Sequence, residues 1–174
     1  GVYRAGTYPP DKPGLRLDLL KYWAKEARKL GLKTIVEVLD IRQVDKIAPH
    51  ADAFQVGARH QQDYALLMEL AKSKRVVTLK RHPGSNLHEF LGSAEYLLRG
   101  NCKPILIERG SSTHLNHCRW DLSISLIAAV KRITGLPILV DPSHGTGRRD
   151  LVEPMALAGI AAGADGLLIE VHFQ

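Results

Sequence analysis

The sequence predicts an α/β protein built as a (β/α)8 TIM barrel, with strands two to eight visible and the first strand and last helix absent. Short runs of Val, Ile and Leu alternate with longer amphipathic segments, which indicates repeated βα units and a parallel sheet. The apolar runs also end in charged residues, which a barrel gathers on one face. With 174 residues the chain is shorter than the about 250 of a typical barrel. We therefore expect one barrel domain, residues 1–174, truncated at both ends.

The expected strands are short, nearly continuous in aliphatic residues and bounded by Gly, Pro or charge, as in parallel strands covered on both faces. They lie at residues 1–5, 33–38, 53–57, 75–80, 104–109, 137–141 and 166–171. Apolar residues at helical spacing predict helices at residues 15–30, 41–47, 61–72, 87–99, 122–133 and 151–162. No G-x-G-x-x-G turn follows the first strand and no P-loop is present, which favours a barrel over a doubly wound sheet.

Charged side chains close all of the expected strands after the first. One such residue is easily explained as a solvated loop residue, but a consecutive series predicts a single polar site, because parallel strands end on the same face. The residues are Glu37 and Asp40, Arg59, Lys80 and Arg81, Glu108 and Arg109, Asp141 and His144, and Glu170 and His172.

The composition favours a small anionic ligand in the cytoplasm. The formal net charge is +6, but the basic residues form no arginine-rich or aromatic–basic run, which argues against nucleic-acid binding. Cys102 and Cys118 are too few for a disulfide framework or a cysteine-based zinc cluster. No signal peptide and no apolar run long enough to cross a bilayer are visible, so we expect a cytoplasmic protein without membrane contact.

Arg59, Lys80 and Arg109 follow successive strands, so a barrel brings three cations close together. Cations in one small volume repel each other unless an anion neutralises them, and phosphate or carboxylate suits the arginine fork. Two alternatives stay open at this point. Each cation could pair with a nearby carboxylate such as Glu37 or Glu108, and Lys80 could be the Schiff-base nucleophile of an aldolase.

His144 and Glu170 form a second constellation on adjacent strand ends. An imidazole and a carboxylate can share a divalent metal that acts as a Lewis acid. The same pair can equally form a simple hydrogen bond. His172 lies two residues beyond Glu170 and shares its face if the strand continues.

At these residues the chain resembles the class I, β-type 3-deoxy-D-arabino-heptulosonate-7-phosphate (DAHP) synthases, collinearly over essentially all 174 residues. The matching stretches are QVGAR at 55–59, LKR at 79–81, IERG at 107–110, VDPSHGTGRRD at 140–150 and AAGADGLLIEVH at 161–172. The resemblance implies condensation of phosphoenolpyruvate with erythrose 4-phosphate on a divalent metal, Mn²⁺ or similar, in the first step of the shikimate pathway of aromatic amino acid biosynthesis.

The resemblance also implies a role for individual residues. Lys80 and His144 are implied to be catalytic, and His144 and Glu170 to bind the metal. The residues implied to hold phosphoenolpyruvate are Arg4, Ala58, Arg59, Lys80, Glu108, Arg109 and Asp141.

Three features depart from the family pattern. The family's other metal ligands are a cysteine in a Gly-Pro-Cys context on the first strand and an aspartate after the last strand, and neither segment is present. The family's Lys-Pro-Arg-Thr loop, which grips the acceptor sugar phosphate, is replaced by Pro-Pro-Asp-Lys at residues 9–12. The phosphoenolpyruvate half of the site is therefore expected to be the better retained half.

Two alternative functions remain. One is the related 3-deoxy-octulosonate-8-phosphate synthase, which uses arabinose 5-phosphate. The other is a degenerate, non-catalytic barrel that binds anions or partners. A full-length member of the family is implied to be a homo-oligomer, and an open barrel with unpaired strand edges is also expected to associate.

Overall fold

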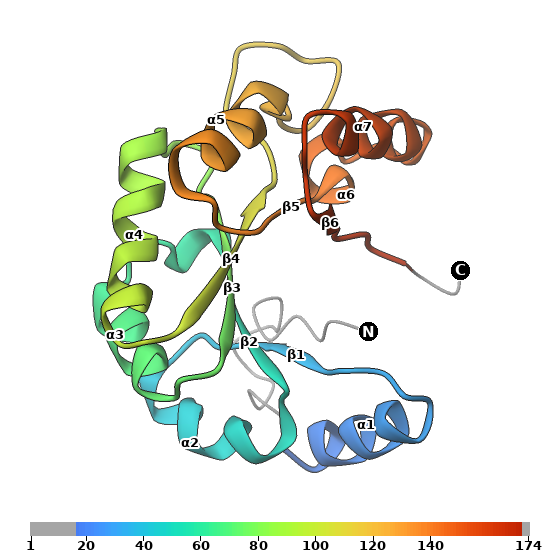
Figure 1. The fold of residues 1–174 in the computed structure, drawn as a ribbon. Helices are drawn as coiled ribbons and strands as arrows, with labels where there is room; N and C mark the ends of the chain where they lie inside the picture. Colours follow the sequence, from blue (N-terminus) through green and yellow to red (C-terminus); the bar gives the residue numbers. More distant parts are fainter. Residues whose placement is uncertain (1–16, 172–174) are drawn as a thin grey trace.

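The structure is a computed structural model that describes residues 17–171. It contains a six-stranded, fully parallel sheet whose strand order follows the chain, β1 to β6. Every crossover therefore runs in the same direction, and the sheet curls as half of a barrel instead of reversing as a doubly wound sheet does. Figure 1 shows helices α2 to α5 along the outer side of this curve. The expected strand at residues 1–5, Arg4, the loop at 9–12 and His172 lie outside the described residues.

The strands of the sheet are short and match the aliphatic runs of the sequence. Their bounds are β1 Ile35–Glu37, β2 Ala53–Val56, β3 Val76–Lys80, β4 Lys103–Glu108, β5 Ile138–Val140 and β6 Gly166–Leu167. The last strand is much shorter than expected from residues 166–171, because only its first two residues pair with β5. The Leu168 backbone N–H still donates to the Val140 carbonyl at 2.9 Å, but residues 168–171 are not part of a strand.

Helices follow most strands, as the periodicity predicts. They are α1 Leu17–Lys29, α2 Val44–Ile47, α3 Tyr64–Lys72, α4 Leu87–Arg99, α5 Ile124–Thr134, α6 Pro142–Thr146 and α7 Arg149–Ala161, with 3-10 turns η1 Ile41–Gln43, η2 Ala48–His50 and η3 Ala58–His60. The start of α4 has a full capping box: Asn86 accepts from the Glu89 backbone N–H, and Glu89 accepts from that of Asn86. No helix within residues 17–171 is long and apolar enough to span a membrane.

Alternation along the strands separates an apolar outer face from a more polar inner face. The outer face packs on the helices in one core cluster that includes Phe54, Val77, Leu79, Leu106 and Val140. The alternate residues, among them Gln55, Thr78 and Lys80, point to the inside of the curve. The polar side chains that could bind a ligand therefore stand on the inner face and at its carboxyl-terminal edge.

Asp165 ties the turn before β6 to the beginning of β5. Its carboxylate accepts hydrogen bonds from Lys131 Nζ at 2.8 Å and from the Ile138 backbone N–H at 2.8 Å. The hydrogen bond from Lys131, followed by that from Ile138, lowers the pKa of Asp165 below its ordinary value. A carboxyl with a lowered folded-state pKa stabilises the fold above its unfolded-state pKa and loses this effect as pH falls.

Asp165→Asn is expected to lower the melting temperature at pH 7 by about 1–3 °C, a small shift because the pair is partly exposed. The difference from the unmodified chain should begin to shrink as pH falls below about 4, the ordinary pKa of the carboxyl in the unfolded chain, and should vanish only below the lowered folded-state pKa, where Asp165 is neutral. Thermal unfolding followed by circular dichroism across pH 3–7 measures this. A pH-independent difference would contradict the assigned role of the charge.

Candidate functional site

Lys80, Arg109 and Asp141 meet at the carboxyl-terminal edge of the sheet. Lys80 ends β3, Arg109 follows β4 and Asp141 follows β5, and the registers Lys80↔Ile107 and Glu108↔Val140 place these ends side by side. Lys80 Nζ lies 3.0 Å from Asp141 Oδ2. Because all three side chains are buried, their charges act in a medium less screening than water.

Asp141 organises this edge. Besides the Lys80 contact, it accepts from the His144 backbone N–H at 2.9 Å, which caps α6, and lies 2.8 Å from His144 Nδ1. Burial by itself raises the pKa of Asp141, but the hydrogen bond from His144 and the charge of Lys80 outweigh it, so the pKa is lowered. Asp141 is therefore an ionised group that fixes an amine on one side and an imidazole on the other.

His144 presents its second ring nitrogen to Glu170. Its Nε2 lies 3.9 Å from Glu170 Oε2, and the backbone N–H of Glu170 donates to Ser143 Oγ at 3.0 Å. An imidazole whose other nitrogen is held by a carboxylate has the orientation that metal-bound histidines usually have. One imidazole and one carboxylate suit a divalent transition metal. Within residues 17–171, however, no group of three or more His, Cys, Asp or Glu side chains is arranged to hold a metal ion.

Arg109 is a buried cation without a direct anionic partner. Its side chain is only 6% exposed, and it forms no hydrogen bond or ion pair with another residue of the described range. Its guanidinium lies 5.6 Å from the centroid of the Trp120 ring. Burial, above all, lowers the pKa of Arg109, although the charge of Asp141 acts in the opposite direction. A bound anion at this position would supply the missing hydrogen-bond acceptors.

Arg81 and Glu108 form a buried ion pair on the other side of the strand ends. Arg81 Nε and Nη2 donate to Glu108 at 2.5 and 2.8 Å, and both side chains are essentially inaccessible to solvent. Glu108 also accepts from the backbone N–H groups of Gly110 and Ser123. The sequence reasoning did not anticipate this pair, although strand alternation next to an inward-facing Lys80 already places Arg81 on the opposite face.

Arg59 and Ala58 lie in η3, directly after β2. The Arg59 side chain is exposed, and it makes no hydrogen bond or ion pair within the described part of the chain. Glu37, which the sequence offered as its carboxylate partner, instead lies 3.4 Å from the Gln55 amide and packs against Gly57. Of the three cations Arg59, Lys80 and Arg109, only Lys80 therefore pairs with a carboxylate within the described residues, and this carboxylate is Asp141. Glu108 pairs with Arg81 instead.

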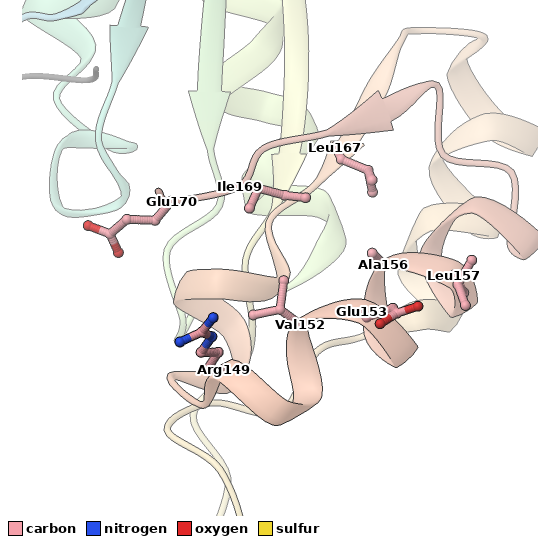
Figure 2. A pocket seen from close by; sticks show the side chains of 8 residues that line it. All are labelled: Arg149, Val152, Glu153, Ala156, Leu157, Leu167, Ile169 and Glu170. Atoms are coloured by element: carbon pink, nitrogen blue, oxygen red, sulfur yellow. The ribbon is translucent and has the colours of Figure 1, made fainter. Parts of the chain in front are cut away.

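An apolar groove lies beside this edge, between α7 and the segment that contains β6 (Figure 2). Figure 2 shows Leu167 and Glu170 at opposite ends of that segment, with Glu170 directed away from the groove's apolar part. The lining residues are Arg149, Val152, Glu153, Ala156, Leu157, Leu167, Ile169 and Glu170. The groove is therefore distinct from the buried site of Lys80, Arg109 and Asp141, because it contains none of these residues. It approaches that site only through Glu170, which lies near His144.

Comparison with known proteins agrees with this arrangement. The chain is 42% identical over 173 residues to phospho-2-dehydro-3-deoxyheptonate aldolase of Thermotoga maritima, covering 99% of this chain and 51% of that protein. It is 30% identical over 190 residues to 2-dehydro-3-deoxyphosphooctonate aldolase of Pelobacter propionicus, covering 99% of this chain and 64% of that protein. The chain thus spans about half to two thirds of the length of these curated relatives.

Solved structures show the same fold relationship. The crystal structure of the Thermotoga maritima DAHP synthase matches with a TM-score of 0.90 at 42% identity, over 95% of this chain and 49% of that one. A truncated form of the 3-deoxy-D-arabino-heptulosonate 7-phosphate synthase from the same organism matches with a TM-score of 0.88, over 95% of this chain and 62% of that one. The family model described as the DAHP synthetase I family matches residues 4–174. The chain belongs to the DAHP synthetase I family.

Proposed function

We propose that this chain carries the phosphoenolpyruvate-binding part of an enzyme that condenses phosphoenolpyruvate with an aldose phosphate, most simply erythrose 4-phosphate to give DAHP. The observation that carries the proposal is the buried Arg109, which lacks a carboxylate partner beside the Lys80–Asp141 pair. The proposal includes a complete (β/α)8 barrel, in which the described half-barrel supplies part of the wall. Membership of the family and the name of the Thermotoga relative support it.

The proposed cradle takes its cations from separate strand ends. Arg109 and Lys80 form its buried part, and Arg59 is the exposed cation that can close on the ligand; Arg4 is proposed to join them. Phosphoenolpyruvate carries both a phosphate and a carboxylate, and guanidinium forks bind either group with paired hydrogen bonds. Ala58 is proposed to contact the same ligand from η3.

Two acidic residues predicted to contact the substrate fit a supporting role better. Asp141 is held by Lys80 and His144, and Glu108 is held by Arg81 and lies on the outer face. We infer that Asp141 sets the positions of Lys80 and His144, and that Glu108 fixes the strand end from which Arg109 projects. The Lys80–Asp141 ion pair also argues against the Schiff-base alternative, since that chemistry needs a neutral amine.

The chemistry proposed for the intact enzyme is positional and electrostatic. Carbon 3 of phosphoenolpyruvate bonds to the aldehyde carbon, water adds at carbon 2, and inorganic phosphate leaves with cleavage of its C–O bond. Arg109, Arg59 and Lys80 orient the enol phosphate and offset its charge. His144 and Glu170 are the residues of this chain that would hold Mn²⁺ or a similar ion, which polarises an aldehyde oxygen when bound. We also propose that the enzyme is a cytoplasmic homo-oligomer.

The acceptor sugar is tested by phosphate release from the intact protein with phosphoenolpyruvate and either aldose phosphate. We expect faster release with erythrose 4-phosphate than with arabinose 5-phosphate, and loss of release on adding a chelator. His144→Ala and Glu170→Ala should abolish it, because each removes a proposed metal ligand, whereas Glu153→Ala, which removes a carboxylate from α7, should not.

The 30% identical octulosonate relative keeps arabinose 5-phosphate open as the acceptor. Faster release with arabinose 5-phosphate would assign the chain to that reaction. Binding of phosphoenolpyruvate without turnover on either sugar would instead support the non-catalytic barrel.

A further inference from the structure

The loop that connects β4 to α5 is packed tightly against the turn that carries His144. The backbone N–H groups of Arg119 and Trp120 donate to the carbonyls of Thr146 and Gly145 at 2.8 and 2.9 Å. A Cβ placed on Gly110, whose φ is +105°, would lie 2.4 Å from Trp120 Cβ. Trp120 therefore lies between Gly110 and the turn that carries His144. Position 110 must be glycine, because any larger residue would clash with Trp120 there.

The Trp120 ring is shared by two arginines. The guanidinium carbon of Arg109 lies 5.6 Å from the ring centroid, and that of Arg119 lies 5.9 Å from it. Both distances are within the range of about 6 Å in which a cation is attracted to an aromatic face. The indole Nε1 is buried and has no hydrogen-bond partner in the described range. The indole therefore forms no hydrogen bond within the described residues. Any effect of Trp120 on the two arginines must come from the aromatic face of its ring.

We propose that Trp120 is a positioning residue for the anion site, which holds the guanidinium of Arg109 in place through its ring. The inference rests on the proposed function, because it assumes that Arg109 meets the bound anion. Arg109 needs such a support, since it has no hydrogen-bond partner of its own within residues 17–171. The charge of Arg119 also repels it and contributes to lowering its pKa. The aromatic face opposes this repulsion and keeps the fork oriented before the anion arrives.

The test compares two substitutions of Trp120 in the intact protein. Trp120→Phe keeps an aromatic face and removes the unpaired indole N–H, whereas Trp120→Leu keeps apolar bulk and removes the ring. Calorimetric titration with phosphoenolpyruvate should show about 5- to 30-fold weaker binding for Trp120→Leu and about 3-fold or less for Trp120→Phe. Equal affinities for the two variants would overturn the proposal.

A double-mutant comparison separates positioning from packing. In an Arg109→Ala background, Trp120→Leu should change the affinity for phosphoenolpyruvate by less than about 2-fold, because the ring has no fork left to hold. The same loss with and without Arg109 would mean that Trp120 acts through general packing, and the inference would fail while the proposed function stands. If Arg109→Ala alone leaves the affinity unchanged, the proposed function itself fails.

A spectroscopic readout covers the case in which Trp120→Leu does not fold. Trp23, exposed on α1, is the second tryptophan of the chain, so Trp23→Phe leaves Trp120 as the single indole fluorophore. Saturating phosphoenolpyruvate should change its emission, and Arg109→Ala should abolish that change. A ligand-induced change that survives Arg109→Ala would contradict the coupling between this ring and this guanidinium.

Discussion

Arg109→Ala is expected to weaken phosphoenolpyruvate binding by about 10- to 100-fold, the largest effect that we expect on the ligand. The fork would contribute charge-assisted hydrogen bonds, each worth about 1.5–3 kcal/mol. Arg109 is already desolvated in the free protein, so little of that energy is spent on removing water from it. Isothermal titration of the intact protein with phosphoenolpyruvate measures the loss.

Two further arginine-to-alanine variants serve as comparisons for Arg109→Ala. Arg59→Ala should weaken binding less than Arg109→Ala, because the exposed Arg59 must give up more hydration and side-chain freedom to bind. Arg132→Ala removes the same charge from an exposed position in the last turn of α5 and should have little effect. Equal affinity in the unmodified, Arg59→Ala and Arg109→Ala proteins would refute the cradle.

Arg81→Met is expected to reduce the free energy of unfolding by about 3–5 kcal/mol, because it leaves the buried Glu108 carboxylate without its counter-ion. For a domain of this size that loss corresponds to a fall in melting temperature of about 6–20 °C. Chemical denaturation followed by circular dichroism gives the free energy directly. Arg42→Met breaks a surface pair, in which Arg42 is exposed and Asp40 is half-buried, and should change stability little.

The double variant Arg81→Met with Glu108→Gln separates charge from packing. Glutamine keeps an oxygen that can accept from the Gly110 and Ser123 backbone N–H groups, but it carries no charge. Part of the stability lost in Arg81→Met should therefore return. A double variant that is less stable than Arg81→Met would show that the carboxylate charge is not what makes the single change costly.

The sequence was informative where one physical signal dominated. The aliphatic runs located β2 to β5 within a residue or two at each end, because buried parallel strands allow few other residues. The helix at residues 87–99 has the bounds of α4, which a capping box and Gly100 delimit. The complete barrel, by contrast, remains a proposal, since the described residues form a curled half-barrel.

Other features could not be predicted because they depend on contacts distant in the sequence. The short helix α6 was not expected, since Pro142, Gly145 and Gly147 are typical of a loop, but Asp141 and Pro142 provide its first turn. The pairing of Arg81 with Glu108 and of Lys80 with Asp141 depends on strand register, which neither periodicity nor composition specifies. The support of Arg109 by Trp120 likewise arises only when two loops fold together.

The opposite orientations of Lys80 and Arg81 limit which insertions and deletions the sequence of β3 can accept. Lys80 faces the inside of the curved sheet, where the ligand is proposed to bind, and Arg81 faces the side that the helices cover. A shift of that strand by a single residue would turn both side chains to the opposite face and separate Lys80 from Asp141 and Arg81 from Glu108. An insertion or deletion within residues 76–81 should therefore impair both folding, through Arg81, and ligand binding, through Lys80. The loops farther from this edge can vary in length.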